Sequence, residues 1–260
     1  MLILLPPSEG KVSPSRGPRL ALTTLSFPDL TATRKEVADA LVRLSTGPAA
    51  KARTVLDISA RQEDELERNR TLLTAPTAPA GEVYAGVLYD ALDLASLDVR
   101  SRRRAASDIA IASALFGLLR VTDRVPAYRL SGDTSLPGVG RLAAAWRAPL
   151  QEAIRAAAGR GIVLDLRSSA YAALGPVPPD LAERTATARV LQERGGKRTI
   201  VSHHNKATKG RLVRGLLAEP RPRSAEDLAG ALGAAGYRVE LQVPAGPGKP
   251  WTIDVVVKEL

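Results

Sequence analysis

The chain opens with Met1-Leu2-Ile3-Leu4-Leu5 and continues directly into Pro6-Pro7-Ser8-Glu9-Gly10-Lys11. The apolar run at residues 2–5 predicts a β-strand, and the Pro-Pro and Ser-Glu-Gly runs that follow it favour a turn. Open α/β sheets bind ligands in the loops that follow the carboxyl ends of their strands. The opening of the chain therefore predicts a strand followed by a candidate ligand-binding loop.

Helical and strand patterns alternate along the rest of the chain. Apolar residues recur at helical spacing in 33–44 and 82–94, and 63–73 is charged and helical in pattern. The second half predicts helices at 141–155, 205–217 and 224–232, and strands at 108–115, 125–130, 162–166, 185–191, 199–203, 237–243 and 252–257. This alternation predicts an α/β (α+β) fold with a mixed, partly parallel β-sheet flanked by helices. Because no repeat or linker interrupts it, we expect residues 1–260 to form a single domain.

The composition excludes several classes of protein. The chain has 260 residues, of which 45% are apolar, and this is typical of a globular protein. It has no cysteine, so disulfides, thiolate metal sites and thiol catalysis are excluded. No stretch approaches the ~20 apolar residues that a membrane span needs, and the first apolar run is too short for a signal peptide. We therefore expect a cytoplasmic protein that does not enter a membrane.

The formal net charge is +10, and most of the excess lies in one segment. From Arg194 to Arg223 there are nine Lys or Arg residues and a single acid, Glu219, which gives a net charge of +8. Such a basic segment indicates a phosphate-bearing partner, although a generally Arg-rich protein would show it without any partner. Aromatic residues make up 3% of the chain, which argues against base stacking and favours duplex nucleic acid.

The loop at residues 6–11 offers three groups to a ligand. Ser8 carries a hydroxyl, Gly10 has a permissive backbone, and the ammonium of Lys11 attracts phosphate. The loop is not a P-loop, because GxxxxGK[ST] is absent. The alternative interpretation is a rigid proline turn that ends in a solvated lysine.

Two arginines follow the predicted strand at 108–115. Either Arg120 or Arg129 could clamp a phosphate through two nitrogens, and Tyr128 lies beside the second of them. An internal ion pair between Arg120 and Asp123 is an equally good interpretation.

Glycines mark two further segments. Gly138 and Gly140 resemble the hairpin of a helix-hairpin-helix DNA-binding element, in which glycine N–H groups meet a phosphate at a helix start. Residues 129–135 lack a helical pattern, so the first helix of such an element is missing, and an ordinary turn is the alternative. For Tyr84 and Gly86 the simplest interpretation is structural: an aromatic residue on a helix face and a glycine that allows close packing.

The predicted helix at 205–217 begins with cations. Lys206, Lys209 and Arg214 fall within about 140° of one another on a helical projection. Cations near a helix N-terminus oppose the macrodipole, so this basic face indicates function rather than helix stability. His203 and His204 would point to opposite faces of a strand, and we expect no metal site there.

Ser168 and Tyr171 follow the predicted strand at 162–166 and could face the same cleft as the first loop. A catalytic triad can be written from Ser168, His203 and Asp165. No nucleophile elbow GxSxG supports it, so we do not expect a serine hydrolase.

At these residues the chain resembles the peroxide-stress YaaA family nearly end to end. The matching elements, in order, are Met-Leu-Ile-Leu at the start, Val83-Tyr84-x-Gly86, Ser113-x-Leu115-x-Gly117-x-Leu119-Arg120, Tyr128-Arg129-Leu130, Trp146, Leu-x-x-Ser-x-x-Tyr ending at Tyr171, and Lys206-x-x-Lys209-Gly210-x-x-x-Arg214. The resemblance implies a cytoplasmic protein that binds DNA and limits free intracellular iron and oxidative DNA damage during hydrogen peroxide stress. Two elements depart from it: residues 6–11 replace a shorter Ser-Pro-Ala-Lys turn, and Ser131-Gly132-Asp133 replaces Glu-Met-Gly.

Two functional hypotheses follow. In the first, the protein binds nucleic acid, duplex DNA above all, through Gly138, Gly140, Lys206, Lys209, Arg211 and Arg214. In the second, it is an enzyme that acts on a nucleotide or nucleobase, with catalytic residues Lys11, Glu9 and Tyr171 and ligand-binding residues Ser8, Lys11, Tyr84, Arg120, Tyr128, Arg129 and Ser168. We expect no cofactor in either case. If the strands are mostly parallel, one cleft should contain Lys11, Tyr84, Arg129, Tyr171 and Lys206.

Overall fold

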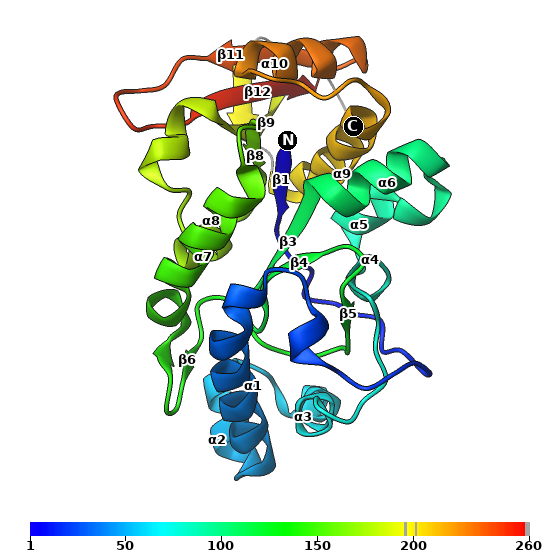
Figure 1. Cartoon of the computed structure of the whole chain (residues 1–260), viewed down its shortest axis with the longest axis vertical. Coiled ribbons are helices and arrows are strands. Elements are labelled where there is room, and N and C mark those ends of the chain that lie inside the picture. The colour runs from blue at the N-terminus through cyan, green and yellow to red at the C-terminus, as the bar shows by residue number, and fades with distance from the viewer. Residues whose placement is uncertain (195–196, 201, 258–260) are drawn as a thin grey trace.

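The computed structural model describes residues 1–194, 197–200 and 202–257. Within them, an eight-stranded sheet has the order β11-β12-β9-β8-β1-β3-β4, and β10 pairs with β9 (Figure 1). The strands are β1 (Leu2–Leu5), β3 (Ile109–Ser113), β4 (Gly117–Arg120), β8 (Val163–Asp165), β9 (Thr185–Arg194), β10 (Lys197–Ile200), β11 (Arg238–Gln242) and β12 (Trp251–Val257). Pairing is parallel for β1–β3, β1–β8, β8–β9 and β9–β12, and antiparallel for β4, β10 and β11. The mixed, partly parallel sheet predicted from the sequence is confirmed.

Helices cover the sheet, and two small two-stranded sheets lie outside it. Figure 1 shows α7 and α8 to one side of β1, and α5, α6 and α9 to the other. The helices are α1 (Thr31–Thr46), α2 (Ala49–Leu56), α3 (Glu63–Arg70), α4 (Ala80–Val83), α5 (Val87–Leu92), α6 (Val99–Asp108), α7 (Leu142–Ala158), α8 (Ser169–Leu174), α9 (Ser202–Ala218) and α10 (Ala225–Ala234). Short 3-10 helices lie at Leu22–Thr24, Pro28–Leu30, Ala60–Gln62, Leu94–Ser96 and Pro179–Arg184. One small sheet pairs β2 (Ala78–Pro79) with β5 (Arg124–Val125), and the other is a hairpin of β6 (Ser135–Leu136) and β7 (Gly140–Arg141). None of these helices has both the length and the apolar character that crossing a membrane requires.

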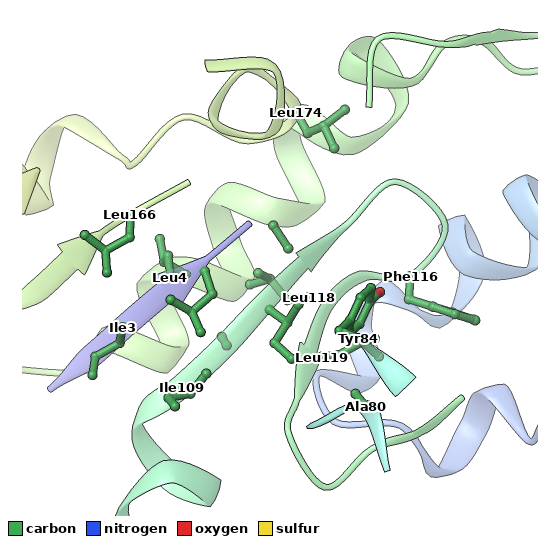
Figure 2. Packing of buried hydrophobic residues seen from close by; sticks show 14 of the residues in the cluster. Ile3, Leu4, Ala80, Tyr84, Ile109, Phe116, Leu118, Leu119, Leu166 and Leu174 are labelled. Carbon is green, nitrogen blue, oxygen red and sulfur yellow. The ribbon is translucent and has the colours of Figure 1, made fainter. Parts of the chain in front are cut away.

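Strand β1 lies at the centre of the core. Its four residues are at most 1% exposed, and Ile3 pairs with Ile109 on one side and with Leu164 on the other. In Figure 2 the side chains of Ile3 and Leu4 lie between Leu166 and the β3–β4 hairpin. Burial of one such side chain contributes about 1.5–3 kcal/mol to the stability of the fold. The central position of this short, wholly apolar strand is therefore strongly favoured.

The chain changes direction across the sheet at β1 and β8. From β1 the next strand of the main sheet, β3, lies on one side, whereas from β8 the next strand, β9, lies on the other. Neighbouring parallel strands with connections that leave in opposite directions form a crevice beyond their carboxyl ends, and ligands bind there in open α/β sheets. The loops after β1 and β8 are therefore the expected walls of a site.

The structure corrects several element boundaries. The segment at 82–94 is not one helix: α4 and α5 are separated at residues 84–86, where Gly86 has φ +105°. The strand expected at 199–203 ends at Ile200, and the backbone is helical from Ser202, so His203 and His204 lie in α9 and their side chains are outside the described residues. At 125–130 the strand is limited to Arg124–Val125.

Helix α9 approaches α5 closely at one glycine. A Cβ added to Gly210 would lie 2.2 Å from the backbone oxygen of Leu88 and 3.0 Å from Ala91 Cβ. A backbone oxygen inside a helix cannot move aside as a flexible side chain can. Only glycine therefore lets the two helices pack at this distance.

We predict that Gly210→Ala lowers the free energy of unfolding by about 1–3 kcal/mol, because the methyl group forces α9 away from α5. Gly230→Ala in α10 is the matched control, since a Cβ there meets nothing within 4 Å and alanine favours helix by about 0.5–1 kcal/mol. Urea denaturation of both variants measures the effect. Equal stabilities for the two variants would show that the close approach is unimportant.

Candidate functional site

A cleft of about 850 Å³ lies at the carboxyl ends of β1 and β8. Its walls come from segments that are distant in sequence: residues 6–12 after β1, residues 85–89 at the start of α5, residues 129–131, the turn and helix after β8, and the first turns of α9. The side chains that carry polar groups are Ser8, Glu9, Lys11, Tyr89, Arg129, Ser131, Ser168, Tyr171, Asn205, Lys206 and Lys209. The crevice beyond the carboxyl ends of β1 and β8 is therefore an open cavity lined by polar side chains.

Lys11 occupies the inner end of the first loop. Its Nζ donates hydrogen bonds to the backbone oxygens of Ser8 (3.0 Å) and Glu9 (3.3 Å). The same atom lies 4.4 Å from the ring centroid of Tyr128 and 5.5 Å from that of Tyr84, within the range of cation–π attraction. Burial, together with the nearby positive charge of Arg129, lowers the pKa of Lys11 to about 8.

A tyrosine cluster lies beneath Lys11. The hydroxyl oxygens of Tyr84 and Tyr128 are 2.8 Å apart, and Ser113 Oγ lies 2.7 Å from the latter. Tyr89 stacks on Tyr84 at 5.7 Å between ring centroids and donates a hydrogen bond to Pro6 O. Burial raises the pKa of Tyr84, Tyr89 and Tyr128, so these hydroxyls remain neutral and fix the loop that presents Lys11.

The break between α4 and α5 makes this arrangement possible. The backbone of Tyr84 pairs with that of Lys11 in an isolated antiparallel bridge, and Ala85 N donates to Ser8 Oγ at 3.1 Å. Gly86 then takes φ +105°, which favours glycine. A continuous helix through these residues would turn the Tyr84 backbone away from the loop, so the break attaches the loop to the tyrosine cluster.

Arg129 is held at its backbone and free at part of its side chain. Asn69 accepts from Arg129 N (2.8 Å) and donates to Arg129 O (2.9 Å). The guanidinium lies 3.8 Å from the carboxylate of Glu9, whose side chain is 89% exposed. Arg129 Nε is buried and has no hydrogen-bond partner among the described residues, so one donor in the cleft wall is left for a ligand.

Helix α9 supplies the opposite wall. Lys206 is exposed, and Lys209 Nζ donates to Leu166 O at 3.1 Å after the end of β8. Burial lowers the pKa of Lys209. Asn205 Oδ1 is buried and has no donor within the described part of the chain. The cleft thus contains one unused donor and one unused acceptor. Since a buried polar atom normally has a hydrogen-bond partner, these two atoms indicate a place for a ligand.

Comparison with known proteins identifies the family. A family model described as peroxide stress protein YaaA matches residues 1–242. The chain belongs to the YaaA family. It is 52% identical to a UPF0246 protein of Streptomyces coelicolor over the full length of both chains, and 41% identical to one of Corynebacterium glutamicum over 99% of this chain and all of the relative. A UPF0246 protein of a Marinomonas strain is 28% identical over 85% of this chain and 86% of its own.

The two departures of this YaaA-family chain from the family pattern meet at the cleft. The longer first turn provides its wall at residues 6–11. In the second departure Ser131 lines the cleft, and a Cβ on Gly132 would lie 3.4 Å from the ring of Tyr171. Changes 120 positions apart in sequence therefore alter the same cavity, which is where a difference in bound ligand would act.

The structure brings together most of the residues singled out for ligand binding. Ser8, Glu9, Lys11, Arg129, Ser168, Tyr171, Lys206 and Lys209 line the cleft. Tyr84 and Tyr128 lie behind Lys11 and do not line it. The expectation of one cleft therefore holds for Lys11, Arg129, Tyr171 and Lys206. The fifth residue, Tyr84, does not line the cleft, and its ring lies beneath the amine of Lys11.

Other candidates lie elsewhere. Arg120 donates to Ile109 O and packs over Phe27, and no ion pair to Asp123 forms, because Asp123 accepts from the Arg120 backbone N–H instead. The hairpin of Gly138 and Gly140 is real, but residues 126–134 contain no helix, so it is not a helix-hairpin-helix element. It does not line the cleft.

The basic segment does not form one surface. Arg214 donates to the backbone oxygens of Leu92 and Asp93, Arg221 pairs with Asp108, and Arg198 pairs with Glu193 and Glu240. Arg214 therefore does not line the cleft with Lys206 and Lys209, and Arg211 is exposed outside the cleft. Of the triad Ser168, His203 and Asp165, the side chain of His203 lies outside the described residues, and Asp165 is bound by Arg167 through two hydrogen bonds of 2.9 and 2.7 Å.

The sequence interpretation missed three residues of the site. Tyr89 and Asn205 line the cleft, and Asn69 positions Arg129. Asn205 is the first residue of the helix predicted at 205–217, which in fact starts at Ser202. Asn69 lies 60 positions from Arg129, and no local pattern connects them. Within the described residues no group of three His, Asp or Glu side chains is placed to hold a metal ion.

We predict that Lys11 makes stability depend on pH. Its pKa is about 8 in the folded protein and 10.5 in the unfolded chain, so between these values the unfolded state binds more protons and stability rises with pH. Below pH 8 both states are protonated, and the cost of burying the ammonium is fully present. Relative to Lys11→Met, the wild type should therefore gain stability from pH 8 to pH 10.

Urea denaturation of wild type and Lys11→Met over this range measures the difference. The charges that act on Lys11, from Arg129, Arg68, Glu9 and Glu65, are common to both proteins. Lys51→Met, at an exposed position in α2, is the control and should run parallel to wild type. Parallel curves for Lys11→Met as well would contradict the lowered pKa.

Proposed function

We propose that this peroxide-stress protein binds nucleic acid, duplex DNA above all, and seats one phosphate-bearing nucleotide unit in the cleft. The observation that carries the proposal is the convergence of four cationic side chains on one cavity from separate segments: Lys11, Arg129, Lys206 and Lys209. Glu9 is the only acid among the lining residues. Like charges repel one another, and burial adds to that cost, so such a cluster indicates an anionic ligand.

Three features support a built site rather than a generally basic surface. Two of the four cations are partly desolvated, as the lowered pKa values of Lys11 and Lys209 indicate. The unused donor of Arg129 and the unused acceptor of Asn205 match a ligand that carries both kinds of group, as a nucleotide does. Arg198 and Arg221 in the basic segment pair with acids of the protein, so the cleft is the better candidate for phosphate contact.

DNA binding would link the cleft to the peroxide-stress role of the family, since a covered strand is shielded from oxidants. From the resemblance alone we also propose that the protein acts in the cytoplasm and helps to limit free intracellular iron.

A second function, an enzyme acting on a nucleotide or nucleobase, is favoured by one observation. Lys11 is a partly buried amine in a ligand-sized cavity, and with a pKa of about 8 roughly a tenth of it is unprotonated at pH ~7. Amines that are desolvated and close to another cation are suited to nucleophilic and acid–base work. Tyr171 also lines the cleft, and Glu9 lies at its rim.

We predict that Lys206→Glu weakens binding to duplex DNA roughly tenfold, and equally on all sequences, because it removes one phosphate contact. The slope of log affinity against log salt should become shallower by about 0.9. Arg211→Glu is the matched control: it lies on α9, is exposed, and makes the same change in charge outside the cleft. Fluorescence anisotropy at several salt concentrations measures both.

Equal losses in the two variants would show that net charge, rather than the cleft, attracts DNA. Unchanged affinity in Lys206→Glu would remove the cleft from the interface.

A further inference from the structure

The amine of Lys11 has unused bonding capacity inside the cleft. Its Nζ donates to two backbone oxygens, those of Ser8 and Glu9, and no third partner is found among the described residues. The faces of Tyr128 and Tyr84 shield it on another side. A lysine that only closed its own loop could do so at the surface, whereas this one lines an 850 Å³ cavity.

The groups around this amine suit a phosphorylated sugar. Arg129 comes from the segment after β5, and Lys206 and Lys209 come from α9, so cations from two separate segments can bind phosphate while the sugar faces Lys11. Ser131, Ser168 and Tyr171 add hydroxyls to the lining. The cavity falls within the usual size of small-ligand sites, roughly 300–1,000 Å³.

We propose that Lys11 forms a reversible Schiff base with the aldehyde of a ring-opened, phosphorylated sugar held in this cleft. The sugar is either a base-free deoxyribose within a DNA strand or a free sugar phosphate, and both present the same aldehyde beside a phosphate. The strand form rests on the proposed function, and the free form does not.

The reaction needs no oxidant, reductant or metal. The lone pair of Nζ attacks the aldehyde carbon, the C–N bond forms, and the carbonyl π electrons move to oxygen, which takes a proton to give a carbinolamine. That proton comes from nitrogen, which keeps one N–H. The hydroxyl then takes a proton from solvent and leaves as water while the nitrogen lone pair forms the C=N bond, and nitrogen releases its last proton to solvent. One aldehyde and one amine thus give one imine and one water, and hydrolysis reverses the reaction.

The chemistry requires an unprotonated amine, and the site provides it. With a pKa of about 8, roughly a quarter of Lys11 is unprotonated at pH ~7.5, against roughly a thousandth for an ordinary lysine. Arg129 contributes to this shift and so acts as a positioning and tuning residue. Lys209 lies in the same cleft, but its Nζ donates to Leu166 O. Lys51, which is exposed in α2 and does not line the cleft, is the control position.

The test is reductive trapping with sodium cyanoborohydride, which converts an imine into a stable secondary amine. The full chain is incubated with an oligonucleotide duplex that contains one base-free deoxyribose, with the same duplex carrying a tetrahydrofuran analogue that lacks the aldehyde, or with 2-deoxyribose 5-phosphate. Peptide mass mapping locates the adduct, and it distinguishes Lys11 from the other lysines and from the amino terminus. Anisotropy with the tetrahydrofuran duplex measures binding separately from chemistry.

We expect an adduct at Lys11 in wild type and in Lys51→Arg, and at least a tenfold loss of adduct in Lys11→Arg, which keeps the charge. The tetrahydrofuran duplex should bind without forming an adduct. Mapping in the wild type decides the question even if a variant fails to fold.

Binding of the duplex with no adduct at Lys11 from either aldehyde would overturn the Schiff base and leave the proposed function standing. An adduct with the sugar phosphate but no binding of either duplex would keep the Schiff base and overturn nucleic-acid binding. Adducts spread over many lysines, or found at Lys209 alone, would also overturn the proposal.

Discussion

Strand β1 has a parallel neighbour on each side, and the position of the cleft depends on that pairing. Ile3 is in register with Ile109 of β3 and Leu164 of β8, so the three strands end at the same edge. The loops that follow β1 and β8 are then close in space although they are more than 150 positions apart in sequence. Since β1 is almost fully buried, a change in its register would move every cleft wall at once.

The fold also has to accommodate cations away from water. Lys11 uses backbone oxygens and tyrosine faces for this purpose, and Arg34 uses a similar solution deeper in the core. Arg34 is 0% exposed and donates to the backbone oxygens of Ser26, Phe116 and Leu118, with no carboxylate in direct contact. Burial lowers its pKa to about 10. Partial negative charges on carbonyl groups thus replace water around both side chains, and only the lysine is left facing a cavity.

Patterns that are local in sequence predicted much of this structure. The apolar run of β1, the helical spacing of α1 and α7 and the alternation of elements fixed the fold class, because each depends on neighbouring residues. The break at residues 84–86 was not foreseen, since both sides of it carry helical spacing and the reason for it is the backbone of Lys11, more than 70 positions away. The charge of the basic segment misled for the same reason: acids such as Asp108 and Glu240 are distant in sequence and adjacent in space.

The hydrogen bonds of Arg214 have a consequence for how the protein is made. Helix α5 is six residues long, and helices of that length are not stable alone. Its last carbonyl groups, at Leu92 and Asp93, are capped by Arg214, and its side is covered by α9 at Gly210. Because domains are synthesised from the N-terminus, the first loop leaves the ribosome long before the helix that completes its surroundings. The nascent chain therefore carries all of the Lys11 loop but gains the wall that α9 supplies only after residues 202–218 have been synthesised.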